Sequence, residues 1–116
     1  MCAVSRQEIG VDIQKQTREY RRGIAKRFFH PDEYKYLKKN NFKDFFPVWT
    51  AKESYVKYTG RGVAEGFSTF SVVSFGRIAQ SVNGAQIRFL SFDPDYCLYL
   101  CAEKIGEIKL YNEPFI

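Results

Sequence analysis

Residues 42–62, FKDFFPVWTAKESYVKYTGRG, decide the fold of this chain. At the helical period of 3.6 residues, one side of the stretch collects five apolar residues, Phe42, Phe45, Phe46, Trp49 and Val56. Pro47 lacks an N–H and disfavours helix at the residue before it, so we expect a helix from about Pro47 to about Tyr58. Gly60 and Gly62 are expected to end it.

This central helix places the carboxylate of Glu53 near the middle of its apolar stripe. A carboxylate that faces a core loses its hydration, which is costly unless an ion pair, a pKa shift or a bound metal compensates. The simplest partner is Lys57, four residues further on, in a surface pair of about 0.3–0.5 kcal/mol. The alternative is that Glu53 has a functional role. A second carboxylate elsewhere in the chain that faces the same site would favour this interpretation.

Length and composition predict a single domain over residues 1–116 with one core. The chain is 45% hydrophobic and 17% aromatic, which is typical of a folded protein. Its apolar runs are too short to cross a membrane and no secretory signal is visible, so we expect a cytoplasmic protein with no membrane partner. The three cysteines, Cys2, Cys97 and Cys101, indicate free thiols in a reducing compartment.

Positive charge is concentrated in the first half of the chain. Residues 1–62 hold 14 Lys/Arg and 7 Asp/Glu, a net charge of +7, within a total of +5. This imbalance favours an acidic partner, either nucleic acid or an acidic protein, although a solvated basic helix face is a common alternative. We expect no nucleic-acid partner, because the aromatic residues have interior periodicity and no DNA or RNA motif is present.

The first half is predicted to contain two short strands and two helices. Residues 2–5 and 9–13 read as two short strands that a hairpin or a tight bend would bring together as a pair. In the second strand Asp12 shares a face with Gly10 and Gln14, where it is either a solvent-facing residue or a hard oxygen ligand on a rigid element.

The first helix is predicted from Thr17 to about Phe29, with Tyr20, Ile24 and Phe28 on its inner side. A second helix follows over residues 31–39, with inward-facing Tyr34 and Leu37. His30, at the junction, is expected to cap or pack rather than to catalyse.

After Gly66 the sequence pattern changes to strands. Asn83-Gly84 is a strong hairpin signal, and the residues after Tyr96 read as a buried strand. The predicted strands cover residues 67–73, 78–81, 85–91, 96–102 and 109–111.

Two segments together resemble the signature motifs of the 4′-phosphopantetheinyl transferases. They are IGVDI (residues 9–13) and WTAKESYVK (residues 49–57), with a basic helix and FFHPDEY (residues 28–34) between them. The later DPDY (residues 93–96) is similar to the end of the larger, surfactin-synthetase-type enzymes, to which the small holo-acyl-carrier-protein synthases are related. The resemblance covers nearly the whole chain. It implies an α+β half-unit of the transferase fold, a small antiparallel sheet packed against about three helices.

The resemblance also implies an activity, the Mg²⁺-dependent transfer of 4′-phosphopantetheine from coenzyme A to a serine of an acyl or peptidyl carrier protein. By motif position, Asp12 and Glu53 would bind Mg²⁺, and Glu53 would also help to deprotonate the serine. Lys57 would hold the pyrophosphate, supported by Lys52. The remaining implied contacts are Gly60 and Gly62 near coenzyme A, and Arg18, Arg21, Arg22 and Lys26 against the acidic carrier.

The sequence departs from the family pattern in two respects. Gln14 stands where many surfactin-type members have a third acidic ligand. Those enzymes are pseudodimers of two similar halves, and this chain matches the second half, beginning just after the His-Ser-Gly segment that contacts coenzyme A. We therefore expect a homo-oligomer that completes the site at a subunit boundary. The alternative is a catalytically incomplete carrier-protein-binding module or fragment that retains the fold.

Overall fold

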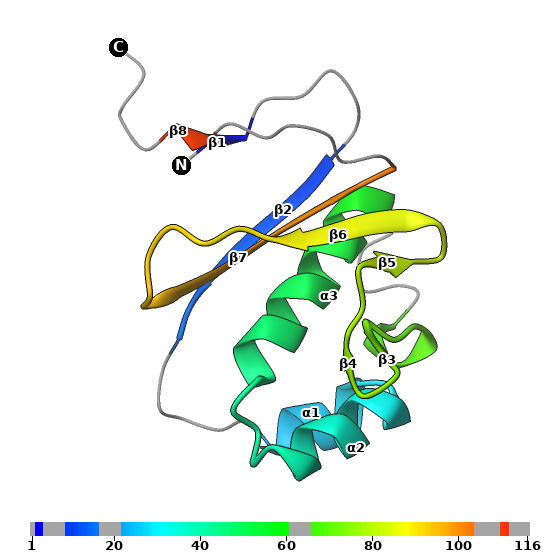
Figure 1. The fold of residues 1–116 in the computed structure, drawn as a ribbon. Helices are drawn as coiled ribbons and strands as arrows, with labels where there is room; N and C mark the ends of the chain where they lie inside the picture. Colours follow the sequence, from blue (N-terminus) through cyan, green and yellow to red (C-terminus); the bar gives the residue numbers. More distant parts are fainter. Residues whose placement is uncertain (1, 4–8, 17–21, 61–65, 104–109, 112–116) are drawn as a thin grey trace.

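The computed structural model describes residues 2–3, 9–16, 22–60, 66–103 and 110–111. Its main body is an antiparallel sheet with helix α3 lying along one face, and helices α1 and α2 lie together near the beginning of α3 (Figure 1). This is the expected α+β architecture of three helices and a small sheet. None of the described helices is long and apolar enough to span a bilayer.

The main sheet has four strands in the order β2-β7-β6-β5. They are β2 (Ile9–Lys15), β5 (Ser81–Val82), β6 (Ala85–Phe89) and β7 (Tyr96–Ala102). The central strand β7 is buried from Cys97 onwards, which confirms the predicted buried strand. The hairpin between β5 and β6 is also confirmed, because Asn83 and Gly84 have φ values of +49° and +84°, the two positive angles that a type I′ turn requires.

Two further pairs of short strands were not fully anticipated. Strand β1 (Cys2–Ala3) pairs with β8 (Leu110–Tyr111), so the predicted pairing of β1 with β2 is wrong. Strand β3 (Val73–Ser74) pairs with β4 (Arg77–Ile78) in a separate hairpin.

The strand predicted over residues 67–73 is wrong over most of its length. Its first part is the 3-10 helix η2 (Phe67–Thr69) instead. The carbonyl oxygens of Phe67 and Phe70 both accept hydrogen bonds from the Lys52 ammonium, at 2.5 and 2.8 Å. A backbone that turns these two carbonyls towards one cation is not available to a regular strand ladder.

Helix α2 (Pro31–Lys39) has the predicted bounds, and His30 is its N-cap. The Nδ1 atom of His30 accepts a hydrogen bond from the backbone N–H of Asp32 at 3.1 Å. In return the backbone N–H of His30 donates to the Glu33 carboxylate at 2.9 Å, which completes a capping box. The structure therefore confirms the capping role expected for the single histidine.

Helix α1 (Arg22–Phe28) confirms the predicted inner side only in part, because Ile24 packs against the core but Phe28 does not. Phe28 is 47% exposed, whereas Ala25 and Phe29 are buried, and Tyr20 lies outside the described residues. Phe29 leaves the helix and stacks on Phe45 with 5.6 Å between ring centroids. The inward-facing residues of this segment are therefore Ile24, Ala25 and Phe29.

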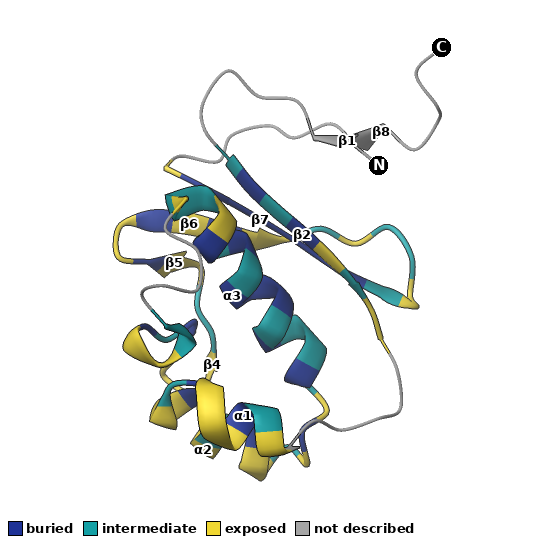
Figure 2. Cartoon of the chain, turned by 180° about the vertical axis from the view of Figure 1, so that it is seen from behind, coloured by how far each residue is buried: buried dark blue, intermediate teal, exposed yellow. Residues whose placement is uncertain are grey.

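Helix α3 (Phe45–Thr59) begins two residues before Pro47 and ends at Gly60, whose φ of +69° gives the left-handed cap. The early start is possible because the missing N–H of Pro47 falls in the first turn, where no intrahelical acceptor exists. Figure 2 shows buried residues along the side of α3 that faces the sheet. The fully buried Val48 and Ala51 belong to the hydrophobic core.

Candidate functional site

Strand β2 crosses helix α3 at Gly10, and the approach leaves no room for a side chain. A Cβ atom at Gly10 would lie 2.0 Å from the Ser54 carbonyl oxygen and 2.4 Å from the Tyr58 backbone nitrogen. Because alternate residues of a strand share a face, Asp12 is directed towards α3 as well. Asp12 is only 4% exposed, so the alternative of a solvent-facing residue is excluded.

Both carboxylate oxygens of Asp12 have partners. The Lys57 ammonium lies 2.7 Å from Oδ1, and the Gln14 amide donates to Oδ2 at 3.0 Å. The Asp12 side chain is 5% exposed, whereas that of Lys57 is 51% exposed. Lys57 therefore forms its ion pair across to β2, and the simple pair along α3 with Glu53 is not the contact that the structure contains.

Glu53 is partly buried one turn before Lys57. Burial raises the pKa of its carboxyl group, the negative charge of Asp12 raises it further, and the Lys57 ammonium opposes both effects. Glu53 is thus electrostatically coupled to both members of the ion pair. We call Asp12, Glu53 and Lys57 the charged triad.

Lys52 lies elsewhere, although it precedes Glu53 directly in the sequence. Its side chain is fully buried, with the ammonium 2.8 and 3.0 Å from the two oxygens of Glu33. The carbonyl oxygens of Phe67 and Phe70 complete its hydrogen bonds. The structure therefore does not place Lys52 beside Lys57, because residues five apart on a helix point about 140° away from each other.

Glu33 is a buried charge that the sequence analysis missed. It is 0% exposed and also accepts hydrogen bonds from the backbone N–H groups of Val72, at 2.8 Å, and His30. Burial raises the pKa of Glu33, and the adjacent Lys52 opposes that rise. The available signal was its place three residues after the cap, which marks a capping box but not a buried ion pair.

Comparison with known proteins points to the same family as the two motifs that meet in the charged triad. The family profile described as the 4′-phosphopantetheinyl transferase superfamily matches residues 8–110. The chain belongs to that superfamily. This confirms the resemblance drawn from IGVDI and WTAKESYVK.

Individual members of the superfamily are similar over most of the chain. The 4′-phosphopantetheinyl transferase Sfp of Bacillus subtilis (strain 168) is 34% identical over 113 residues, covering 88% of this chain and 50% of Sfp. A second 4′-phosphopantetheinyl transferase of Bacillus subtilis is 33% identical, covering 97% of this chain and 57% of the relative. HetI of Nostoc is 40% identical over 72 residues, or 56% of this chain and 30% of HetI. The chain thus spans about half the length of the curated relatives it matches.

The other expected site residues either lie on separate elements or fall outside the residues that the structure describes. Gly60 ends α3, and Gly62 is outside the described residues. Lys26 is exposed on α1. The description does not extend to Arg18, Arg21 or the side chain of Arg22.

The carboxylate oxygens of Asp12 and Glu53 suit a hard cation. Within the described part of the chain, no cluster of three or more His, Cys, Asp and Glu is placed to hold a metal. Asp12 and Glu53 supply two carboxylates, and Gln14 brings an amide beside them. Mg²⁺ fits this all-oxygen set, because it uses one or two protein carboxylates and completes its shell with water and phosphate oxygens.

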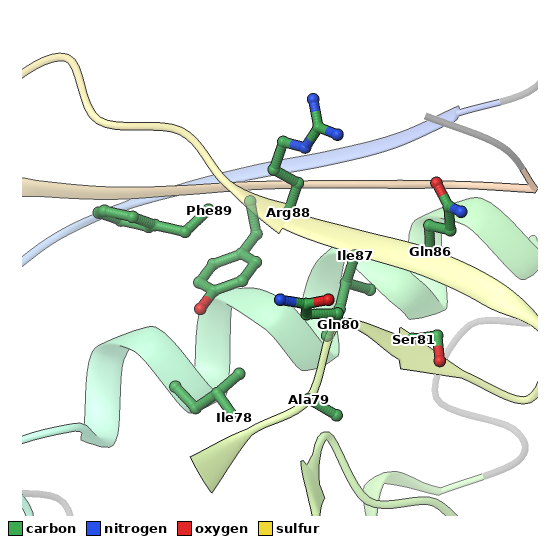
Figure 3. Close-up of a pocket in the computed structure, with 9 residues that line it drawn as sticks. Ile78, Ala79, Gln80, Ser81, Gln86, Ile87, Arg88 and Phe89 are labelled. Carbon is green, nitrogen blue, oxygen red and sulfur yellow. The ribbon is translucent and has the colours of Figure 1, made fainter. Parts of the chain in front are cut away.

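Two hollows of the surface lie away from the charged triad. One of about 610 Å³ is bordered by the segment leading into β5 and by β6, with Ile78, Gln80 and Ile87 around it and Arg88 pointing away (Figure 3). Another, of about 630 Å³, lies between α2 and the hairpin of β3 and β4. Neither is lined by a member of the charged triad.

Proposed function

We propose that this protein transfers the 4′-phosphopantetheine group of coenzyme A to a serine of an acyl or peptidyl carrier protein. The observation that carries the proposal is the 2.7 Å contact between Asp12 and Lys57. It joins the acidic residue of one motif to the basic residue of the other, with the coupled carboxyl of Glu53 beside them. The names of the relatives, which are 4′-phosphopantetheinyl transferases, support the same reaction.

Asp12 and Glu53 would hold Mg²⁺, which when bound neutralises charge on the pyrophosphate of coenzyme A. Glu53 takes the proton of the attacking serine, directly or through a water molecule. Its raised pKa suits this task, because a carboxylate with a higher pKa is a stronger base. The serine oxygen forms the new bond to phosphorus as 3′,5′-ADP leaves.

Lys57 binds the pyrophosphate, since half of its side chain is exposed and the ammonium can reach a ligand. Lys52 acts indirectly in this proposal, because its buried contacts tie α3 to α2, to η2 and to the residue that follows η2. It therefore fixes the helix that carries Glu53 and Lys57 without touching a phosphate. Gly60 ends the same helix. Gly60 and Gly62 would leave the backbone open to coenzyme A.

The carrier protein would dock on basic residues near α1, namely Arg18, Arg21, Arg22 and Lys26. In this proposal a second copy of the chain completes the site at a subunit boundary. The exposed Ile13 on β2 and Phe89 on β6, 43% and 47% exposed, provide apolar area for such a homo-oligomer. A cytoplasmic location goes with carrier-protein substrates.

Loading of an apo carrier protein, followed by mass spectrometry, tests the proposal. The wild-type chain with coenzyme A and Mg²⁺ should add phosphopantetheine, and Asp12→Ala or Glu53→Ala should reduce the rate by at least about a hundredfold. Asp32→Ala is the matched control, because Asp32 is an exposed carboxylate at the start of α2. Carrier binding without loading would favour a docking module instead, and equal loading by all three variants would contradict the assigned roles.

A further inference from the structure

The ion pair of Lys57 and Asp12 occupies the position that a metal ion needs. Asp12 is almost completely buried, and its two oxygens are already engaged by Lys57 and Gln14. An Mg²⁺ ion binds a carboxylate oxygen at about 2.0–2.1 Å. The ammonium of Lys57, 2.7 Å from Oδ1, would then lie against a divalent cation and be repelled.

We infer that Lys57 is an internal counter-ion of Asp12, which a divalent cation must displace and which thereby becomes available to the phosphate. The inference rests on the proposed function, which assigns Asp12 to the metal. It adds that binding of the metal ion and binding of the phosphate are coupled through Lys57.

The asymmetry of burial makes Lys57 the partner that moves. Its side chain is 51% exposed, so the ammonium can leave Asp12 for solvent without unpacking α3. Asp12 cannot follow, because β2 is held against α3 at Gly10, where backbone atoms are in contact distance. Gln14 is uncharged and can keep its hydrogen bond to Oδ2 while a cation approaches Oδ1.

Displacement couples the two binding events. Without the metal, Lys57 is neutralised by Asp12 and attracts a phosphate weakly. With the metal, the freed ammonium and the ion both face the incoming phosphate. Because linkage is reciprocal, a bound phosphate that holds Lys57 also improves metal binding by the same factor.

Metal binding without any turnover tests the inference. Free Mn²⁺ measured by electron paramagnetic resonance gives the affinity of each variant. Lys57→Met should bind Mn²⁺ roughly three- to tenfold more tightly than wild type, since no ammonium has to be displaced. Lys15→Met is the matched control: it removes the same charge from an exposed position of β2, three residues after Asp12. It should change the affinity less than about twofold.

A second measurement follows Lys57 directly. In lysine-selective ¹³C NMR, the signal of the Lys57 ε-carbon should move on addition of Mg²⁺ and saturate, while the Lys15 signal stays in place. Asp12→Asn should remove the response.

The inference is overturned if Lys57→Met binds Mn²⁺ no better than Lys15→Met, or if the Lys57 signal stays fixed while Mg²⁺ binds. If Asp12→Asn still abolishes metal binding in that case, the displacement fails but the metal assignment stands. Absence of Mn²⁺ binding by every variant overturns both.

Discussion

Replacing Lys52 by Met should destabilise the protein severely, although Lys52 lies outside the charged triad. The ammonium is 0% exposed, contacts both oxygens of Glu33 and donates to two backbone carbonyls. Lys52→Met keeps an unbranched side chain of similar length but leaves the Glu33 carboxylate buried without its cation. Breaking a buried pair in this way costs about 3–5 kcal/mol, against a total stability of about 5–15 kcal/mol for a domain.

The pH dependence of this loss has a definite sign. Burial already raises the pKa of Glu33 while Lys52 opposes the rise, so removal of Lys52 raises it further. A carboxyl whose folded-state pKa exceeds its unfolded value is stabilising while protonated. That contribution is lost as the pH rises through the folded-state pKa. Lys52→Met should therefore be closer to wild type at pH 5 than at pH 8.

Urea denaturation followed by circular dichroism measures the free energy of unfolding of each variant. Lys39→Met is the matched control, because Lys39 is exposed on α2 and should change stability by less than about 0.5 kcal/mol. The double variant Lys52→Met/Glu33→Gln should cost less than the sum of the single variants, since it removes the buried charge as well. If Lys52→Met lies within about 1 kcal/mol of wild type at pH 8, the buried pair is not the stabilising contact described here.

Three further outcomes are expected. Gly10→Ala should lower the free energy of unfolding by roughly 1–3 kcal/mol or more, because its Cβ would meet α3 backbone, whereas Gly23→Ala, with open space around it on α1, should be neutral or stabilising; denaturation curves compare the two. Gln14→Glu should tighten Mn²⁺ binding by supplying a further carboxylate next to Asp12, and unchanged affinity would show that residue 14 does not face the ion. Burial raises the pKa of the Cys97 thiol to about 11 and that of Cys101 to about 12, so neither should react with a thiol reagent at pH 8 until the protein unfolds; rapid reaction of the native chain at either position would refute their burial.

Local chemistry in the sequence determined much of the fold. The Asn-Gly dipeptide favours the positive φ angles of the turn between β5 and β6, and the apolar run after Tyr96 is typical of a buried strand. Gly60 ends α3 because glycine adopts the left-handed conformation without steric cost. The family itself was evident from two spaced motifs, which are properties of the linear chain.

Only the tertiary structure decided how the charged residues are paired. The sequence places Glu53 four residues before Lys57, yet the ammonium reaches Asp12, 45 positions away, because β2 packs closely against α3 at Gly10. In the same way Lys52, adjacent to Glu53, turns to Glu33 on another helix. Periodicity specifies which residues share a face of one element. The partner of a charge depends on which second element covers that face, and long-range packing settles this.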